Sequence, residues 1–201
     1  AACIGIPLGV LSAVKQYSLL DTIPSVMAMT LSAVPSFWFG MMLIYFLAYK
    51  LGLFPSYGMG GIEHWLLPTL TIAVVYAAEI LRYTRSSMLE TIRADYVRTA
   101  RAKGVAERTV IWKHAMKNGL LPVITLLGSS FGAQIGGAIV TENLYNLPGL
   151  GTLTLLSINM RDTPTVVATS VIFATLYNII LILVDLMYAF IDPRIKAKYS
   201  R

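Results

Sequence analysis

The sequence predicts an all-α integral membrane protein built as a bundle of several transmembrane helices. Of its 201 residues, 56% are hydrophobic and only 13% are charged, whereas soluble domains are about 25% charged. The mean hydropathy of +0.68 points the same way. Several apolar runs reach the length of about twenty residues that crosses a bilayer core of about 30 Å. The remaining hydrophilic residues concentrate in one long segment in the middle of the chain.

The first two apolar segments cover residues 1–14 and 25–49. Residues 1–14 are too short to cross a bilayer, and no basic segment precedes them as in a signal peptide. We therefore expect the sequence to begin partway through a transmembrane helix. Asp21 and Thr22 offer caps before the second segment. Pro35 inside that segment removes one backbone donor and is expected to bend the helix.

Three further spans are predicted over residues 66–83, 120–141 and 164–190. A short glycine-rich external loop precedes the first of them, and the hydrophilic loop of residues 84–119 follows it. The segment between the last two spans is external and contains the turn-forming sequence Asn-Leu-Pro-Gly at residues 146–149.

The predicted span of residues 120–141 carries Gly128, Gly132 and Gly136 at a spacing of four residues. Small residues at this spacing let two helix backbones approach closely in a bilayer, where van der Waals packing drives association. This helix is therefore expected to lie against a partner helix. Packing within the subunit and lining of a pore are equally compatible with the pattern.

The basic residues provide a test of the topology, because positive residues favour the cytoplasmic side of a membrane. With Lys15, the nine basic residues from Arg82 to Lys117 and the four of the C-terminus inside, 14 of the 16 Lys and Arg residues are cytoplasmic, and only Lys50 and Arg161 are external. Membrane orientation thus accounts for the net charge of +6, and no nucleic-acid partner is indicated.

The hydrophilic loop predicts two short helices joined at Gly104, a residue that adopts a left-handed helix cap without a Cβ penalty. Apolar residues of the first helix share one face: Met88, Leu89, Ile92, Tyr96 and Ala100. A narrower apolar face follows on the second helix: Val110, Ile111, His114 and Ala115. The sequence signal for the start of the second helix is weak, because Ala106 occupies the N-cap position, where Ser or Asp is usual.

No arrangement of residues indicates catalysis. The sequence has no Gly-x-x-x-x-Gly-Lys-Ser/Thr motif to hold ATP phosphates. His64 and His114 are isolated from any cluster of acidic residues and cysteine, so no metal site is predicted, and Cys3 is the single cysteine. The chain is therefore predicted not to be an enzyme.

Two acidic residues, Glu79 and Asp185, lie near the inner ends of predicted spans, where a charge is costly unless it is paired or hydrated. Arg82 follows Glu79 by three residues and could pair with it along the helix. A proton relay through these acids would make the protein a secondary transporter, but two isolated acids support such a relay poorly.

The hydrophilic loop resembles the cytoplasmic loop of bacterial ATP-binding-cassette importer permeases, in the oligopeptide and dipeptide variant. The matching residues are Arg-Thr-Ala-Arg-Ala-Lys-Gly at 98–104 and His-x-x-Lys-Asn at 114–118. The general importer loop carries a Glu and a Pro that are absent here, which argues against the sugar-type branch. The pattern Glu-x-x-x-Asn-x-Pro-Gly-Leu-Gly at 142–151 and the later Arg161-Asp162 are also similar to the peptide permeases.

This resemblance implies a permease subunit of a bacterial inner membrane that forms the translocation path of a peptide importer. It implies that the loop couples transport to a separate ATPase subunit through eleven residues: Arg98, Thr99, Ala100, Arg101, Ala102, Lys103, Gly104, Val105, Ala106, Glu107 and Arg108. The helix-packing or pore residues are then Gly128, Gly132 and Gly136. The external loop, to which a binding protein would deliver substrate, includes Pro148, Gly149, Gly151, Arg161 and Asp162.

The implied partners are two ATP-binding-cassette ATPase subunits, a homologous second permease, an external substrate-binding protein and the lipid bilayer. The chain itself is expected to bind no cofactor and no metal, because ATP and Mg²⁺ would be held by the ATPase subunits. Three alternatives stay open: nickel or glutathione cargo within the same family, an ion-coupled secondary carrier, and a membrane scaffold that transports nothing.

Overall fold

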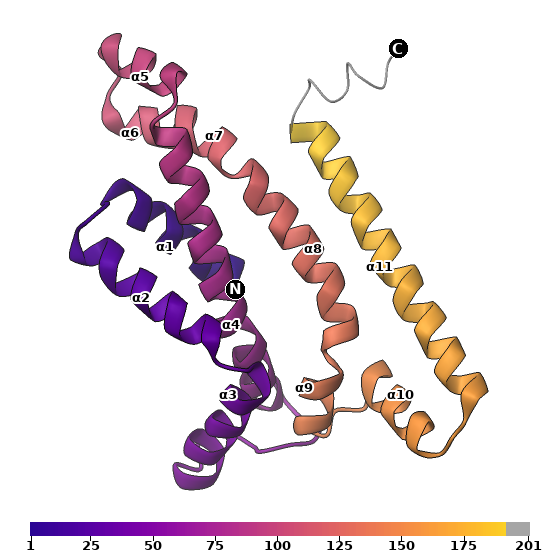
Figure 1. Ribbon diagram of the computed structural model, residues 1–201. Coiled ribbons are helices and arrows are strands. Elements are labelled where there is room, and N and C mark those ends of the chain that lie inside the picture. The colour runs from indigo at the N-terminus through magenta and orange to yellow at the C-terminus, as the bar shows by residue number, and fades with distance from the viewer. Residues whose placement is uncertain (192–201) are drawn as a thin grey trace, which may run out of the picture. The chain divides into compact units, whose positions relative to one another are not determined.

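The computed structural model describes residues 1–191, without the side chains of residues 133, 135–137, 185 and 187–191. Most of the described residues are helical, and none of them belongs to a β-strand (Figure 1). The prediction of an all-α protein is confirmed. The chain divides into two compact units, residues 1–35 with 72–127, and residues 36–71 with the residues from 128 onward.

The helices of the first unit are α1 (Ala2–Val14), α2 (Leu19–Ala33), the later part of α4 (Glu63–Ile92), α5 (Asp95–Ala102), α6 (Glu107–Thr109), the π-helical η2 (Val110–Ala115), α7 (Met116–Gly119) and the start of α8 (Leu121–Gly137). Those of the second unit are α3 (Ser36–Leu43), the π-helical η1 (Ile44–Lys50), the start of α4, the later part of α8, α9 (Ile139–Leu144), α10 (Leu150–Asn159) and α11 (Thr163–Ile191).

Two of the described helices are long and apolar enough to cross a membrane, α4 and the Thr163–Val184 portion of α11. The helices on either side of Pro35 add a third candidate if they are parts of one broken span. The sequence predicts a single bent span over residues 25–49, but α2 ends at Ala33 and α3 begins at Ser36. Val34 is extended, with φ −88° and ψ 125°, because a following proline disfavours the helical conformation.

Two further helix boundaries differ from the predicted spans. Helix α4 continues through the first part of the predicted loop 84–119 to Ile92, because Thr84 and Met88 are fully buried there. Helix α8 ends at Gly137, before the predicted end of its span, and α9 begins two residues later. By contrast, α1 and α11 lie within one residue of the predicted segments 1–14 and 164–190.

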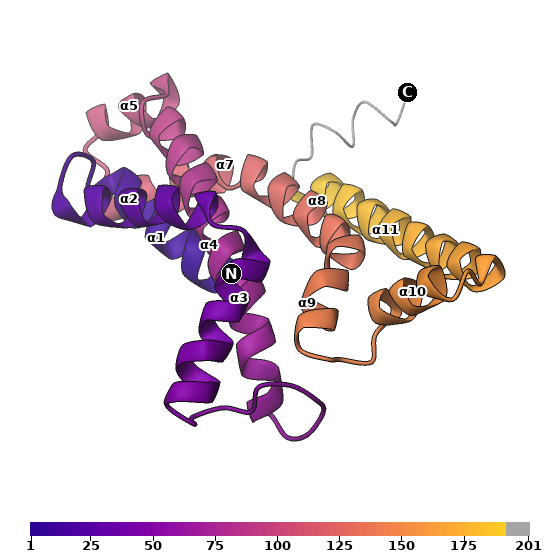
Figure 2. The same cartoon turned by 60° about the horizontal axis from the view of Figure 1, so that its bottom comes forward.

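In the first unit, α1 packs closely on α4 through Gly5 and Gly9. A Cβ atom on Gly5 would lie 2.7 Å from the carbonyl oxygen of Ala77, and one on Gly9 would lie 2.8 Å from that of Leu81. Small residues spaced by four therefore let the two backbones approach. Helix α2 lies beside α1 (Figures 1 and 2) and contributes Ala28 to a buried cluster with α4.

The second unit is centred on Tyr145, whose side chain is 1% exposed. Its hydroxyl hydrogen-bonds with Thr71 Oγ1 at 2.7 Å, which gives the buried phenol the polar partner it requires. Gly40 on α3 allows this packing, because a Cβ atom there would lie 2.9 Å from Thr71 Cγ2 and 2.6 Å from a methyl carbon of Leu144. The polar contact thus joins α4 to α9, and the glycine brings α3 against both.

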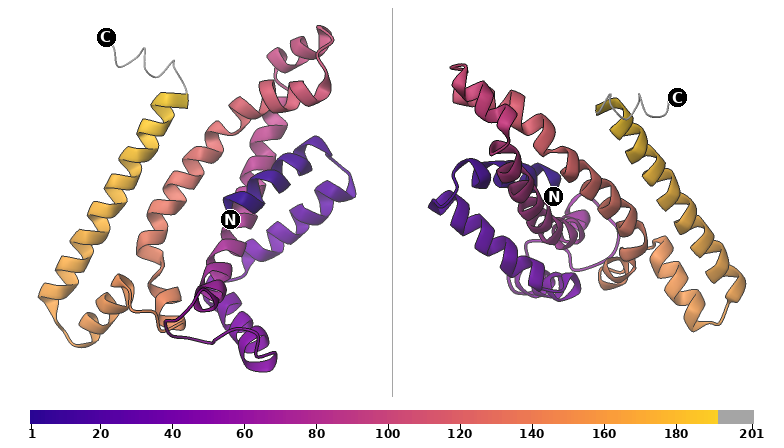
Figure 3. Two further views of the ribbon diagram at one scale, coloured as in Figure 1. Left: turned by 180° about the vertical axis from the view of Figure 1, so that it is seen from behind. Right: turned by 45° about the horizontal axis from the view of Figure 1, so that its top comes forward.

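Helix α11 packs on two neighbours within the second unit. Helix α10 folds back beside its first turns (Figure 3). On α8, a Cβ atom on Gly128 would lie 2.3 Å from Val184 Cγ2, and one on Gly132 would lie 2.7 Å from the ring of Tyr177. The close approach predicted for these glycines is therefore made to α11. The surroundings of Gly136 lie outside the described residues, and a pore-lining role for the three glycines stays a prediction.

Candidate functional site

Residues 95–115 form a helical hairpin at one end of α4 (Figure 1), which we call the loop hairpin. Helix α5 is its first arm, and α6 with η2 is its second. Gly104 makes the turn with φ +75°, the left-handed conformation that the sequence predicts for it. Ala106 then precedes α6 without a side-chain cap, which also agrees with the sequence.

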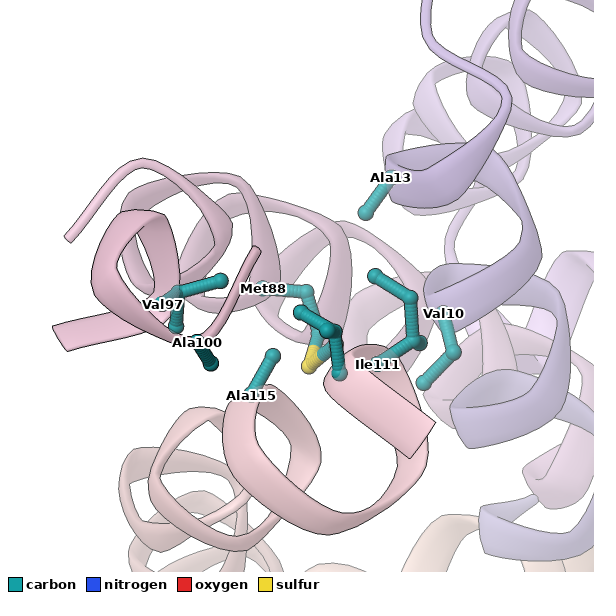
Figure 4. Close-up of a cluster of buried hydrophobic side chains, with 8 residues drawn as sticks. Val10, Ala13, Met88, Val97, Ala100, Ile111 and Ala115 are labelled. Atoms are coloured by element: carbon teal, nitrogen blue, oxygen red, sulfur yellow. The ribbon is translucent and has the colours of Figure 1, made fainter. Parts of the chain in front are cut away.

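A cluster of apolar side chains anchors the loop hairpin to the rest of the first unit. The cluster joins α1, α4, α5 and η2 (Figure 4) and consists of Val10, Ala13, Met88, Val97, Ala100, Val110, Ile111 and Ala115. The sequence places Tyr96 on the apolar face, but Tyr96 is 44% exposed and Val97 is fully buried. The register differs because α4 ends at Ile92 and α5 is a separate helix that begins at Asp95.

Arg101 fixes the two arms of the loop hairpin relative to each other. Its Nη2 donates to Glu107 Oε1 at 2.8 Å and its Nε donates to Glu107 Oε2 at 3.1 Å, across the turn at Gly104. A further hydrogen bond of 3.2 Å joins its Nη1 to the carbonyl oxygen of Ile92 at the end of α4. The hydrogen bonds from Arg101 lower the pKa of Glu107 and raise that of Arg101. Arg101 is thus a positioning residue of the hairpin.

We expect replacement of Glu107 by glutamine to loosen the loop hairpin slightly at neutral pH. The side chains of Arg101 and Glu107 are 35% and 60% exposed, so solvent screening limits the pair to about 0.5 kcal/mol, or about a twofold rise in amide hydrogen exchange. The pKa of Glu107 is lowered in the folded protein, so its stabilisation is present above the ordinary carboxyl pKa of about 4.3 and is lost as the pH falls through the lowered value.

The control for this exchange experiment is Arg98→Gln. Its Nη1 lies 3.9 Å from Asp95 Oδ1, and the Asp95 side chain is fully exposed. This change is expected to leave exchange of the hairpin amides unaltered. Equal exchange in the Glu107→Gln variant and the native protein from pH 7 down to acid would contradict the role of the Arg101–Glu107 pair.

The eleven residues predicted to couple with an ATPase divide by exposure. Ala100 is buried, and Arg101 and Val105 are half-buried. The others are exposed: Arg98, Thr99, Ala102, Lys103, Gly104, Ala106, Glu107 and Arg108. Three cations of this surface, Arg98, Lys103 and Arg108, have no partner closer than 3.9 Å among the described carboxylates. The hairpin therefore presents a cationic turn on an apolar base.

A buried ion pair, which no sequence pattern indicates, joins α2 to α4. Asp21 is 3% exposed. Arg85 Nη2 donates to Asp21 Oδ2 at 2.9 Å, and Arg85 Nε donates to Oδ1. The backbone N–H of Tyr17 and the hydroxyl of Ser25 donate to the same carboxylate at 3.0 and 3.2 Å. Every strong acceptor direction of this buried carboxylate is therefore occupied.

The predicted external loop is organised around Glu142. Its Oε2 accepts hydrogen bonds from the backbone N–H and the hydroxyl of Thr152, at 3.0 and 3.4 Å, at the start of α10. A Cβ atom on Gly149 would lie 2.2 Å from the Glu142 carboxylate, and one on Gly151 would lie 2.6 Å from Ile139 Cα. Gly151 thus permits the close approach of the α9 and α10 backbones, and Gly149 leaves room for the Glu142 carboxylate.

Arg161 and Asp162 form the turn between α10 and α11. Arg161 adopts a left-handed conformation with φ +58°. Asp162 Oδ1 accepts the backbone N–H of Thr165 at 3.3 Å and Oδ2 accepts its hydroxyl at 2.5 Å, the arrangement of a helix N-cap. These geometric functions are independent of any contact with cargo.

The structure so far defines a polytopic helical membrane protein with a cationic helical hairpin. The chain belongs to the family of binding-protein-dependent transport system inner membrane components, whose model matches residues 5–197. The resemblance found in the sequence is thereby confirmed.

Two individual relatives show which members of the family the chain is similar to. The chain is 42% identical over 206 residues to the oligopeptide transport system permease protein AppB of Bacillus subtilis. It is 40% identical over 198 residues to the glutathione transport system permease protein GsiC of Pectobacterium atrosepticum. Each match covers 98% of this chain and 65% of the relative. The chain therefore spans 65% of the length of these curated relatives.

Proposed function

We propose that this chain belongs to the transmembrane permease subunit of an ATP-binding-cassette importer for short peptides. Membership of the binding-protein-dependent inner membrane family carries the proposal. The names of two relatives support the cargo class, because one is an oligopeptide permease and the other a glutathione permease, and glutathione is itself a short peptide. Nickel is not favoured by either name.

In the proposed complex, the loop hairpin docks on an ATPase subunit. The exposed turn of Arg98, Lys103 and Arg108 offers the contact surface, and the apolar cluster below it transmits displacement to α1 and α4. An exposed element on a packed base can move a helix only if the turn itself is rigid, and Gly104 with the Arg101–Glu107 pair provides that rigidity.

The remaining partners are a second permease, a second ATPase subunit and an external substrate-binding protein. The hairpin and the C-terminus are cytoplasmic in this proposal, and the loop of residues 142–162 is external. The C-terminal residues 192–201 lie outside the described residues, so their location rests on their basic charge. The chain binds no nucleotide itself, and ATP with Mg²⁺ is bound by the ATPase subunits.

The first experiment is purification of the full-length protein in mild detergent from cells that express the whole transport system. A stoichiometric ATPase pair is expected in the eluate, with ATP hydrolysis stimulated by the loaded binding protein. A clean preparation without an ATPase would contradict the importer. Uptake that collapses with an ion gradient and persists without ATP would instead identify an ion-coupled carrier, and no uptake under any condition would identify a scaffold.

A further inference from the structure

A cavity of about 790 Å³ lies in the first unit, beside α4. Helix α4 lines one side of it, while Ser25 and Met29 on α2 and Pro122 on α8 line the rest. All of these residues belong to the same compact unit. The cavity is separate from the loop hairpin and from the external loop.

The α4 side of the cavity is one polar stripe. Between Ile72 and Ile92, each exposed residue of α4 lines the cavity: Glu79, Arg82, Tyr83, Ser86 and Glu90. They recur at positions i, i+3, i+4, i+7 and i+11, which places them on one helix face. The opposite face of the same segment is buried and consists mainly of Ala, Ile, Leu and Met.

The polar character of the exposed face of α4 indicates whether that face contacts lipid or water. A helix face in contact with lipid is apolar, because a charged side chain at membrane depth costs several kcal/mol, and such residues face the bundle interior or a water-filled cavity. Helix α4 is one of the helices long and apolar enough to cross a membrane. Its exposed stripe begins within the predicted span 66–83 and continues into the predicted cytoplasmic loop 84–119, and it is charged on both sides of that boundary. Water rather than lipid is therefore the medium of the cavity, which lies at the cytoplasmic end of the predicted span.

Three charged side chains of this cavity, those of Glu79, Arg82 and Glu90, have no ion-pair partner among the described residues. The sequence suggests that Arg82 pairs with Glu79, but neither side chain forms an ion pair within the described part of the chain. Arg85 also lines the cavity, but its guanidinium is paired with the Asp21 carboxylate. The cavity therefore contains a free carboxylate and a free guanidinium three residues apart, and a second free carboxylate, Glu90, eight residues beyond Arg82.

We propose that this cavity is part of the path of the cargo, and that Glu79 and Arg82 bind the two charged ends of a short peptide. Glu79 accepts hydrogen bonds from the terminal ammonium group, and Arg82 donates to the terminal carboxylate. The inference rests on the proposed importer function. It assigns to α4 the residues that recognise a zwitterion at the cytoplasmic end of the predicted span.

The dimensions fit a short peptide. Residues three apart on a helix have Cβ atoms about 5–6 Å apart, and both side chains are long enough to spread further. The ends of an extended dipeptide lie about 7 Å apart. Glu79 and Arg82 would each form a charge-assisted hydrogen bond with one end of the peptide. Such bonds are about twice as strong as hydrogen bonds between neutral groups.

Water access is tested with Met29→Cys in the complete importer, because Met29 lines the cavity and lies within the predicted span 25–49. Cys3 and any cysteine outside residues 1–201 of this subunit are first replaced by serine. We expect a cationic, membrane-impermeant methanethiosulfonate reagent to label residue 29 in inside-out vesicles, and a saturating dipeptide to slow that labelling. The matched control is Val171→Cys on α11, which is 59% exposed, lies within the candidate span Thr163–Val184 and is not among the residues that line the cavity; it is expected to remain unlabelled in lipid.

The outcomes separate this inference from the proposed function. Labelling at residue 29 but not at residue 171, with protection by dipeptide, supports a water-filled path. An unreactive residue 29 in a complex that still imports peptide would show that another subunit or lipid covers the cavity, which overturns the inference and leaves the importer intact. Absence of peptide uptake by the parent complex would instead contradict the proposed importer function.

The charge assignment is tested by comparing cargo analogues in Glu79→Gln and Arg82→Gln. Each uptake rate is divided by that of the parent for the same cargo, so that preferences of the binding protein cancel. Arg82→Gln is expected to lower uptake of a dipeptide with a free carboxylate about tenfold more than uptake of its amide. Glu79→Gln is expected to do the same for a free ammonium against its acetylated form. Equal losses for all cargoes would overturn the recognition of the peptide ends.

Discussion

Valine in place of Gly104 is expected to abolish peptide uptake while leaving membrane insertion intact. Gly104 has φ +75°, and the left-handed conformation costs an ordinary residue about 1–2 kcal/mol, with β-branched residues the most unfavourable. A Cβ atom there would meet nothing within 4 Å, so the strain is entirely in the backbone. The turn must shift to relieve it, which moves the exposed cations and separates Arg101 from Glu107.

The measurement is uptake of a labelled dipeptide, together with recovery of the ATPase subunits on purification. Gly52→Val is the matched control, because Gly52 has φ +62° and is also free of neighbours within 4 Å, but lies outside the loop hairpin. It carries the same local strain and is expected to retain uptake. Gly104→Asn is expected to retain more uptake than valine, since asparagine tolerates this conformation. Similar losses in the two valine variants would contradict a coupling function for the hairpin.

The turn of the loop hairpin could be predicted from the sequence because its determinants are local. Gly104 and Ala106 act through their own backbone conformations, so the residue types alone indicate the geometry. The buried face of α5 could not be predicted in the same way. It depends on where α4 ends, and the break after Ile92 has neither Pro nor Gly to mark it, so Val97 rather than Tyr96 is buried.

Close helix contacts were only partly predictable for a different reason. The spacing of Gly128 and Gly132 indicates close packing, and the structure shows α11 at both. Gly5 and Gly9 have the same spacing and pack on α4, so the same criterion could have identified them. The pairing of Asp21 with Arg85 has no such signal, because 64 residues separate them and each also has an adequate local explanation, as a helix cap and as a cytoplasmic charge.

Alanine in place of Asp21 is expected to destabilise the protein severely. The change leaves Arg85 partly buried without its carboxylate and leaves the N–H of Tyr17 without an acceptor. Removing one partner of a buried ion pair costs about 3–5 kcal/mol. For a protein of this size, that loss corresponds to a fall of about 10 °C in the midpoint of thermal unfolding. The midpoint is measured on the detergent-purified complex, and lower expression is expected in parallel.

A double variant distinguishes the ion pair from simple loss of packing. Asp21→Ala with Arg85→Ala removes both charges, so no unpaired charge remains in the interior, and the double variant is expected to be more stable than Asp21→Ala alone. Asp21→Asn keeps the side-chain volume and removes only the charge, and it should lose most of the stability that alanine loses. Asp95→Ala removes a fully exposed partner of Arg98 and should not shift the midpoint. Additive losses from the two single changes would show that Asp21 and Arg85 act independently, whereas a rescued double variant would show that their pairing holds α2 on α4.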